Sequence, residues 1–222
     1  MNPPPPLPSQ NIPVPLPKKN GFFAWLSKPL VMVCAMGLLG FLAIAAFIGI
    51  YFLSARDFTP TTAQKACIVT ADELANEFVM TVDPSAETWS AQRYLDGSME
   101  IDYEYDDPSP SMIYINCSLS VDASVSDAKY SFGGYWQGMK LGTKIGGGAS
   151  VDIETANHIF KWGDASRFAF LKSGGSRYAL VFVTRKGRKV FYLTIANALL
   201  EDPAEIDAFL QPFLERFDRE HF

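Results

Sequence analysis

The hydrophobic pattern divides the chain into one uncharged apolar stretch and a longer region in which apolar and polar positions alternate. The apolar stretch covers residues 30–53 and contains no Asp, Glu, Lys or Arg. A helix over these residues would be about 36 Å long at ~1.5 Å per residue, enough to cross the ~30 Å hydrocarbon core of a bilayer. The pattern predicts a transmembrane helix with membrane lipid as its partner. Ala45 and Gly49, spaced four residues apart, would let two such helices pack as a homodimer.

Two alternatives to a retained anchor start from the same stretch. A cleavable signal peptide has an apolar core of ~7–15 residues, which is shorter than this one, and no small-x-small cleavage motif follows Leu53. Residues 18–22 (KKNGF) approach a type IV pilin leader, but Leu26 stands where a glutamate is expected. The retained anchor is therefore the favoured interpretation.

Charged residues on the two sides of the stretch indicate its orientation. Three lysines precede it, and one arginine beside an aspartate follows it: Lys18, Lys19, Lys28, Arg56 and Asp57. The positive-inside rule then places residues 1–29, a proline-rich tail expected to be disordered, in the cytoplasm. It places the larger C-terminal part outside the cytoplasm, so we predict a single-pass protein of the cell membrane.

After a threonine-rich linker at 54–65, residues 66–222 have the periodicities of one α+β domain. A period of 3.6 residues and capping motifs predict helices over 70–82, 126–141 and 202–217. Alternating apolar positions predict strands over 98–106, 112–121, 167–171, 178–184 and 190–195. Pro212 lies inside the last helical pattern and predicts a kink or a break there. The predicted fold class is α+β, an antiparallel β-sheet flanked by helices behind an N-terminal transmembrane helix.

The cysteines suggest an oxidising compartment. Cys67 and Cys117 lie in the part predicted to be extracytoplasmic, where disulfides form and persist. Closing a loop of roughly 50 residues would contribute about 4 kcal/mol in the chain-entropy model. We predict a disulfide between these two residues, with two buried free thiols as the alternative. Cys34 lies in the apolar stretch and is expected to be a small packing residue.

The most distinctive polar feature is a row of acidic residues in the strand predicted at 98–106. Glu100, Asp102, Glu104 and Asp106 alternate with apolar residues, so the four carboxylates share one face of the strand. Like charges on one face repel each other. The row indicates either a solvated edge strand that resists aggregation or a surface for a weakly bound Ca²⁺ ion or a basic partner.

A basic hairpin provides the complementary charge. Its members are Arg185, Lys186, Arg188 and Lys189. It could meet the acidic strand, anionic lipid headgroups or a protein partner, although a turn of this kind is most often only solvated. The net charge of −5 and the pI near 5.1 argue against a nucleic-acid partner, which requires a basic surface.

Motifs for catalysis or cofactor binding are not found in the sequence. His158 and His221 have no Cys or His neighbour at metal-ligand spacing. There is no Gly-x-Ser-x-Gly motif, and the glycine-rich segment 142–148 lacks the Gly-Lys-[Ser/Thr] ending of a phosphate loop. We therefore predict no catalytic residue, no metal and no cofactor.

Short features along the domain resemble the Mog1/PsbP-like α/β/α sandwich over about residues 63–217. They are the capped opening Thr70-x-x-Glu73-Leu74, the strand with Cys117, the Gly163-Asp164-Ala165 step, the Lys186-Gly187 hairpin and the terminal helix. The resemblance implies an antiparallel sheet between helices and a non-enzymatic accessory role. We expect a membrane-anchored extracytoplasmic binding or accessory module of the cell envelope with an envelope protein as partner. The alternatives are a component of an assembly or sensing complex, a pilin-like subunit and an envelope hydrolase.

Overall fold

The computed structural model describes residues 55–78, 81–107, 112–146 and 151–222, all within one unit of the chain, Tyr51–Phe222. The proline-rich tail at 1–29 and the predicted transmembrane helix at 30–53 lie outside these ranges. Among the residues described, no helix combines the length and the apolar character needed to cross a membrane.

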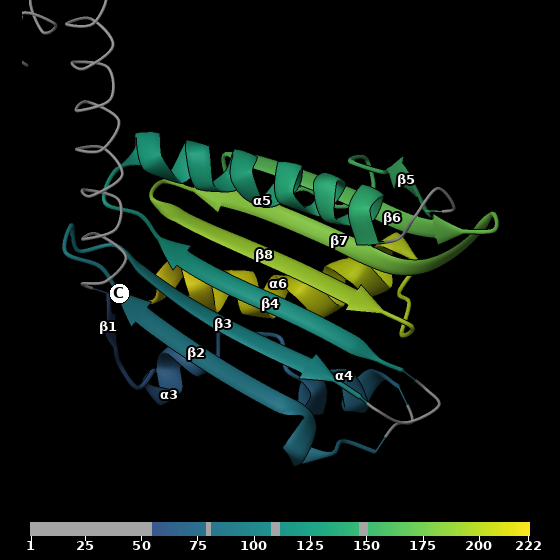
Figure 1. The fold of residues 1–222 in the computed structure, drawn as a ribbon, viewed down its shortest axis with the longest axis horizontal. Coiled ribbons are helices and arrows are strands. Elements are labelled where there is room, and N and C mark those ends of the chain that lie inside the picture. Colours follow the sequence, from purple (N-terminus) through teal and green to yellow (C-terminus); the bar gives the residue numbers. More distant parts are fainter. Residues whose placement is uncertain (1–54, 79–80, 108–111, 147–150) are drawn as a thin grey trace, which may run out of the picture. The chain divides into compact units, whose positions relative to one another are not determined.

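The domain is built on a single eight-stranded sheet in which every neighbouring pair of strands is antiparallel (Figure 1). The order across the sheet is β1-β2-β3-β4-β8-β7-β6-β5. The strands are β1 (Arg56–Asp57), β2 (Glu87–Arg93), β3 (Met99–Asp106), β4 (Tyr114–Val121), β5 (Val151–Thr155), β6 (Ala165–Ser173), β7 (Ser176–Lys186) and β8 (Lys189–Ala196).

Helices lie on both faces of this sheet but cover them unequally. They are α3 (Thr62–Lys65), α4 (Ala71–Glu77), α5 (Val125–Gly146) and α6 (Pro203–Arg219), with a 3₁₀ turn, η1, at Pro84–Ala86. In Figure 1, α6, α3 and α4 lie behind the sheet, whereas α5 crosses the front. α5 packs mainly against β5, β7 and β8. The front of β2, β3 and β4 is therefore not packed under α5.

The burial pattern of the strands follows from this unequal cover. β7 is buried at every position from Ala179 to Arg185, because helices cover both of its faces. β3 alternates instead, with Ile101, Tyr103 and Tyr105 fully buried on the back and polar residues on the front. The apolar stripe of α6 completes the back core, and Trp136 and Met139 of α5 pack with the smaller front core.

The α+β fold class and the antiparallel sheet with flanking helices are confirmed, but several predicted elements differ. The first helix ends at Glu77 rather than near residue 82, and the side chain of Thr70 makes no capping hydrogen bond. A capping box forms instead between Thr61 and Gln64 at the start of α3. The predicted linker 54–65 thus contains β1 and α3.

The last helix is not broken at Pro212, where the sequence predicted a kink or a break. Asp202 caps it by accepting hydrogen bonds from the backbone of Ala204 and Glu205, as expected. Pro212 lies inside α6, which runs on to Arg219. Its apolar stripe stays buried past the proline, with Phe213, Leu214 and Phe217 almost inaccessible. Burial of this stripe outweighs the loss of one backbone hydrogen bond.

The predicted disulfide between Cys67 and Cys117 is not formed in the structure, where both residues are buried free thiols. Each sulfur has another partner, because Cys67 donates to the carbonyl of Ala63 and Cys117 accepts from the backbone N–H of Val69, both at 3.4 Å. Burial raises the pKa of Cys67 to about 11 and that of Cys117 to about 12. The two residues are therefore inert packing groups of the back core in this state.

Candidate functional site

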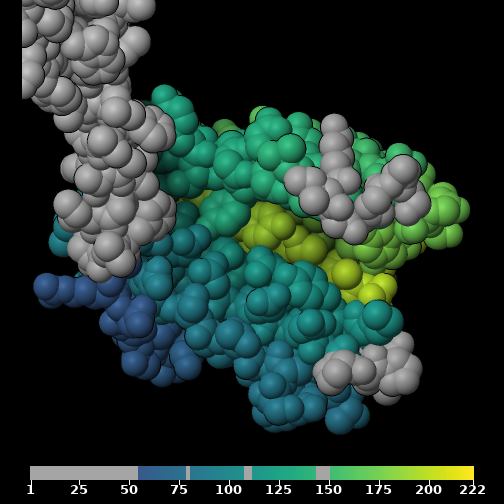
Figure 2. Space-filling model, in the orientation of Figure 1, coloured from purple at the N-terminus to yellow at the C-terminus, as the bar shows by residue number. Residues whose placement is uncertain are grey.

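A pocket opens where the cover of α5 over the sheet ends. Its volume is about 540 Å³. Figure 2 shows the surface hollowed between α5 and the strands β3 and β4, with β8 deeper in the hollow. The lining residues are Tyr94, Ser98, Met99, Glu100, Asn116, Ser120, Asp122, Ser131, Gly134, Tyr135, Gly138, Met139 and Tyr192.

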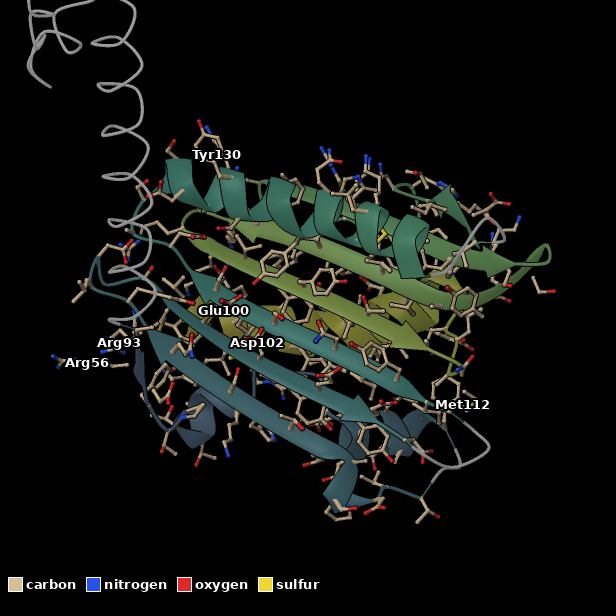
Figure 3. The ribbon with its side chains drawn as sticks, in the orientation of Figure 1. Arg56, Arg93, Glu100, Asp102, Met112 and Tyr130 are labelled. Carbon is tan, nitrogen blue, oxygen red and sulfur yellow. The ribbon has the colours of Figure 1, made fainter. Side chains whose placement is uncertain are left out.

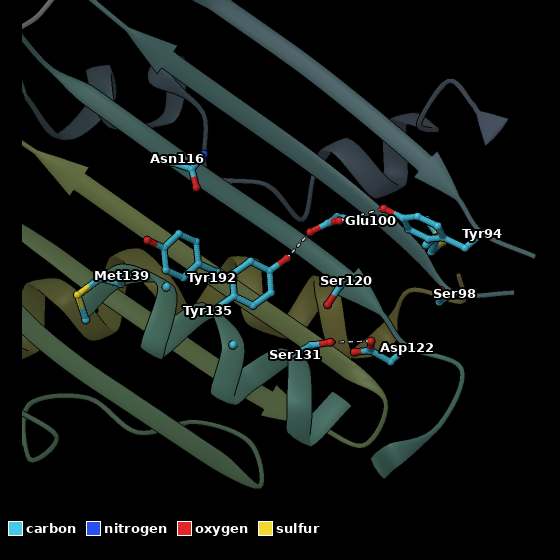
Figure 4. Close-up of a pocket in the computed structure, with 13 residues that line it drawn as sticks. Tyr94, Ser98, Glu100, Asn116, Ser120, Asp122, Ser131, Tyr135, Met139 and Tyr192 are labelled. Atoms are coloured by element: carbon cyan, nitrogen blue, oxygen red, sulfur yellow. Dashed lines mark hydrogen bonds between the residues drawn. The ribbon is translucent and has the colours of Figure 1, made fainter. Parts of the chain in front are cut away.

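Glu100 of β3 is held at one wall of the pocket by two tyrosines (Figure 4). Tyr135 of α5 donates a hydrogen bond to Oε1 at 2.5 Å, and Tyr94 donates to Oε2 at 3.5 Å. The ring of Tyr135 stacks on Tyr192 of β8 at 5.1 Å between centroids. Burial and the nearby charge of Asp102 raise the pKa of Glu100, although the tyrosine hydrogen bonds oppose that shift.

Asp122 and Ser120 form the end of the pocket next to the start of α5. Ser131 of α5 donates a hydrogen bond to Oδ1 of Asp122 at 2.8 Å. Oδ2 of Asp122 and Oγ of Ser120 are buried and have no hydrogen-bond partner among the described residues. Ser120 is only 7% exposed. Burial, and then repulsion from Asp127 and Asp96, raises the pKa of Asp122.

Two glycines of α5 leave the helix side of the pocket open. Gly134 and Gly138 are one turn apart and line the pocket. A Cβ atom at either position would meet nothing within 4 Å. Glycine in a helix interior costs about 1 kcal/mol relative to alanine. Glycine at these two positions therefore makes the helix less stable, although the surrounding structure has room for a side chain at each of them.

The predicted acidic row is on the open front of the sheet, but it is not on an edge strand. β3 lies between β2 and β4 and pairs with both along its length. Figure 3 shows Glu100 and Asp102 on the face that α5 leaves uncovered. Asp102 accepts hydrogen bonds from Ser90 and Ser118, while burial and then the charge of Glu104 raise its pKa. The edge-strand interpretation is wrong because β3 has a paired strand on each side, and one of these, β2, was not predicted from the sequence.

The basic hairpin does not meet the acidic row, because its members are used elsewhere. Arg185 pairs with Asp164 at 3.0 Å and Lys186 with Asp218 at 2.6 Å. Lys189 donates to three carbonyl oxygens at the end of α6, and Arg188 donates to the carbonyl of Ala123. Within the described ranges, no ion pair involves Glu100, Asp102, Glu104 or Asp106.

Sequence reasoning identified Glu100 alone among the residues of this pocket. Three tyrosines from different elements meet there, and no sequence pattern brings them together: Tyr94, Tyr135 and Tyr192. Two signals were present nonetheless. Gly134 and Gly138 repeat at helical spacing, and Ser118 and Ser120 place hydroxyls on one face of a central strand. In the described part of the chain, no group of three or more His, Cys, Asp or Glu residues is placed to hold a metal ion.

Comparison with known proteins finds a distantly similar structure and no related sequence among the curated proteins. No protein-family model and no curated protein matches the chain. The crystal structure of the extracellular domain of PknH from Mycobacterium tuberculosis aligns with a TM-score of 0.43 at 8% sequence identity, covering 73% of this chain and 99% of that chain. A similarity this distant supports no argument about fold family or function. The Mog1/PsbP-like resemblance therefore stays a prediction.

Proposed function

We propose that the chain is a membrane-anchored, extracytoplasmic binding module of the cell envelope, and that the pocket between α5 and the open half of the sheet is its binding site. The observation that carries the proposal is the pair of buried, unpartnered oxygens on Ser120 and Asp122. A buried polar group without a partner costs about 1–3 kcal/mol. A bound molecule that supplies the missing hydrogen bonds would recover this cost.

The open helix side supports the same proposal. Substituting alanine for Gly134 or Gly138 would favour the helix and would meet no obstacle in the free protein. Retaining glycine there keeps the volume of about 540 Å³ available, which is the size of a typical small-molecule site. The proposed role is that of a binding or accessory protein without catalysis. An envelope protein partner would recognise its ligand-bound form.

Matched substitutions on α5 test the pocket. Gly138→Trp places an indole at the pocket, whereas Gly142→Trp places one on the same helix outside the lining residues. The full chain in detergent is heated with the small-molecule fraction of an envelope extract. We expect that fraction to raise the Tm of wild type and of Gly142→Trp but not of Gly138→Trp. If the fraction raises the Tm of all three proteins equally, or changes the Tm of none of them, the pocket is not a binding site.

The membrane orientation is tested separately. Lysines before residues 30–53 and the single arginine after them support an N-terminus in the cytoplasm. We expect protease added to spheroplasts to digest the folded domain while the bilayer is intact. Digestion that requires lysis would contradict the extracytoplasmic location without bearing on the pocket.

A further inference from the structure

We propose that the pocket takes a small molecule with an organic ammonium group, seated on Asp122 and Ser120 with its aliphatic part along α5. This inference rests on the proposed function, since it names the class of ligand for the same pocket. It follows from three independent features of the lining: its charge, its free acceptors and its apolar surface.

The charge of the lining is negative and uncompensated. Two carboxylates, Glu100 and Asp122, face the pocket, and Asp102 lies beside Glu100 on the same face of β3. The lining, as far as the structure describes it, contains no Lys, Arg or His. Neither of the two carboxylates takes part in an ion pair within the described ranges. An anionic ligand would be repelled, whereas a cation would relieve the repulsion between these groups.

The free acceptors match the donors of an ammonium group. Both oxygens of Glu100 accept hydrogen bonds from tyrosines, and Oδ1 of Asp122 accepts one from Ser131. Oδ2 of Asp122 and Oγ of Ser120 are left without partners. An alkylammonium has three N–H donors on one atom, so it can bond both oxygens at once, and the bond to the carboxylate is charge-assisted. A neutral hydroxyl can donate to Asp122 and accept from Ser120, but it does not neutralise the carboxylate.

The rest of the lining suits an apolar body attached to that charge. Tyr135 and Tyr192 are stacked with an interplanar angle of 15°, and Met139 lies in the same lining. Aromatic faces attract cations, and thioether and aromatic carbon give apolar contact. The open surface of Gly134 and Gly138 leaves room for a methylene chain along the helix. This combination favours an organic amine over a bare metal ion.

Calorimetric titration of the full chain in detergent tests the inference. The probe is cadaverine, a five-carbon diamine, and the neutral control is pentanediol, which has the same carbon chain. The test variant is Asp122→Asn, which keeps the shape of the side chain. The matched control is Glu104→Gln, which removes a charge from the exposed part of the same sheet face outside the lining residues.

We expect cadaverine to bind wild type and Glu104→Gln alike, to bind Asp122→Asn at least tenfold more weakly, and not to be displaced by pentanediol. Equal binding to Asp122→Asn, an equal loss in Glu104→Gln, or no binding at all would overturn the ammonium assignment. The extract experiment with Gly138→Trp separates the two proposals. A ligand that does not bind Gly138→Trp but binds Asp122→Asn as tightly as wild type would support the binding site. The same result would show that the ligand class is wrong.

Discussion

The hydroxyl of Tyr135 lies 2.5 Å from Oε1 of Glu100 and joins α5 to β3 across the pocket. The two residues are 35 positions apart in sequence and belong to opposite walls. This contact ties the helix to the half of the sheet that it does not cover. The same contact places a carboxylate with a raised pKa inside the pocket.

Removing that hydroxyl should loosen the wall without disturbing the aromatic stack. Tyr135→Phe keeps the ring beside Tyr192 but leaves Oε1 of Glu100 without this donor. We expect a loss of about 1–2 kcal/mol in the free energy of unfolding at pH 7, measured by urea denaturation, because a hydrogen bond to a charged group is lost. A variant as stable as wild type would show that the contact does not hold α5 in place.

The acidic row should make the protein less stable as the pH rises. Burial raises the pKa values of Asp102 and Glu100 in the folded state, so the native protein holds these protons more tightly than the unfolded chain does. Their contribution to stability is fully present below the unfolded pKa near ~3.9–4.3 and is lost as the pH rises through the raised folded values.

Asp102→Asn tests that pH dependence. The variant keeps an acceptor for Ser90 and Ser118 but carries no charge. We expect its Tm to exceed that of wild type by about 1–3 °C at pH 7, with the difference shrinking towards pH 4. A variant that is less stable at pH 7, or a difference that does not change with pH, would contradict the assignment.

Gly163 should be among the least replaceable glycines of the domain. Its φ is +71°, and a Cβ there would lie 2.5 Å from the carbonyl oxygen of Arg185. Gly163→Ala should cost about 3 kcal/mol or more, because the backbone beside the Arg185–Asp164 ion pair must move. Gly97 is the matched control, since its φ is +82° with nothing within 4 Å, and Gly97→Ala should cost only about 1–2 kcal/mol. Equal losses in thermal denaturation would argue against the steric explanation.

Lys189 should hold the end of α6. Its Nζ donates to the carbonyls of Phe217, Asp218 and Glu220 at 2.7, 2.8 and 2.7 Å. Lys189→Met removes these bonds and should cost about 1–3 kcal/mol, with faster amide hydrogen exchange in the last turn of α6. Arg188→Met is the control and should stay within ~0.5 kcal/mol of wild type, because Arg188 is exposed. Unchanged exchange in Lys189→Met would contradict this role.

Alkylation of Cys67 and Cys117 tests whether they are free thiols or form a disulfide. With raised pKa values and full burial, Cys67 and Cys117 should resist iodoacetamide in the native protein at pH 8. Both should be alkylated after unfolding without reductant, as peptide mass mapping would show. If they become reactive only after reduction, the disulfide predicted from the sequence is present in the protein as isolated.

The fold was largely predictable because its elements have strong local patterns. The alternation at 98–106 and the capped stripe beginning at Asp202 each reflect one buried face, and the structure confirms both elements. Strand β2 was missed because its exposed and half-buried positions give only a weak pattern. That omission also placed β3 at an edge, which changed the interpretation of the acidic row.

The site was much less predictable, because it depends on where a helix stops covering a sheet. Glu100 was identified by its charge, but its partner Tyr135 comes from α5, and the helical pattern predicted at 126–141 does not say which strands that helix covers. The lack of a hydrogen-bond partner at Oγ of Ser120 and Oδ2 of Asp122, among the residues that the structure describes, depends on the three-dimensional surroundings and has no sequence signal.

Native mass spectrometry of the full chain, released from its own membranes, tests the central claim most directly. Wild type and Gly142→Trp should each retain a small molecule as a discrete added mass. Gly138→Trp, whose indole occupies the pocket, should lack it. If the same added mass persists on Gly138→Trp, or if wild type has none, the pocket between α5 and the sheet is not where this protein binds its ligand.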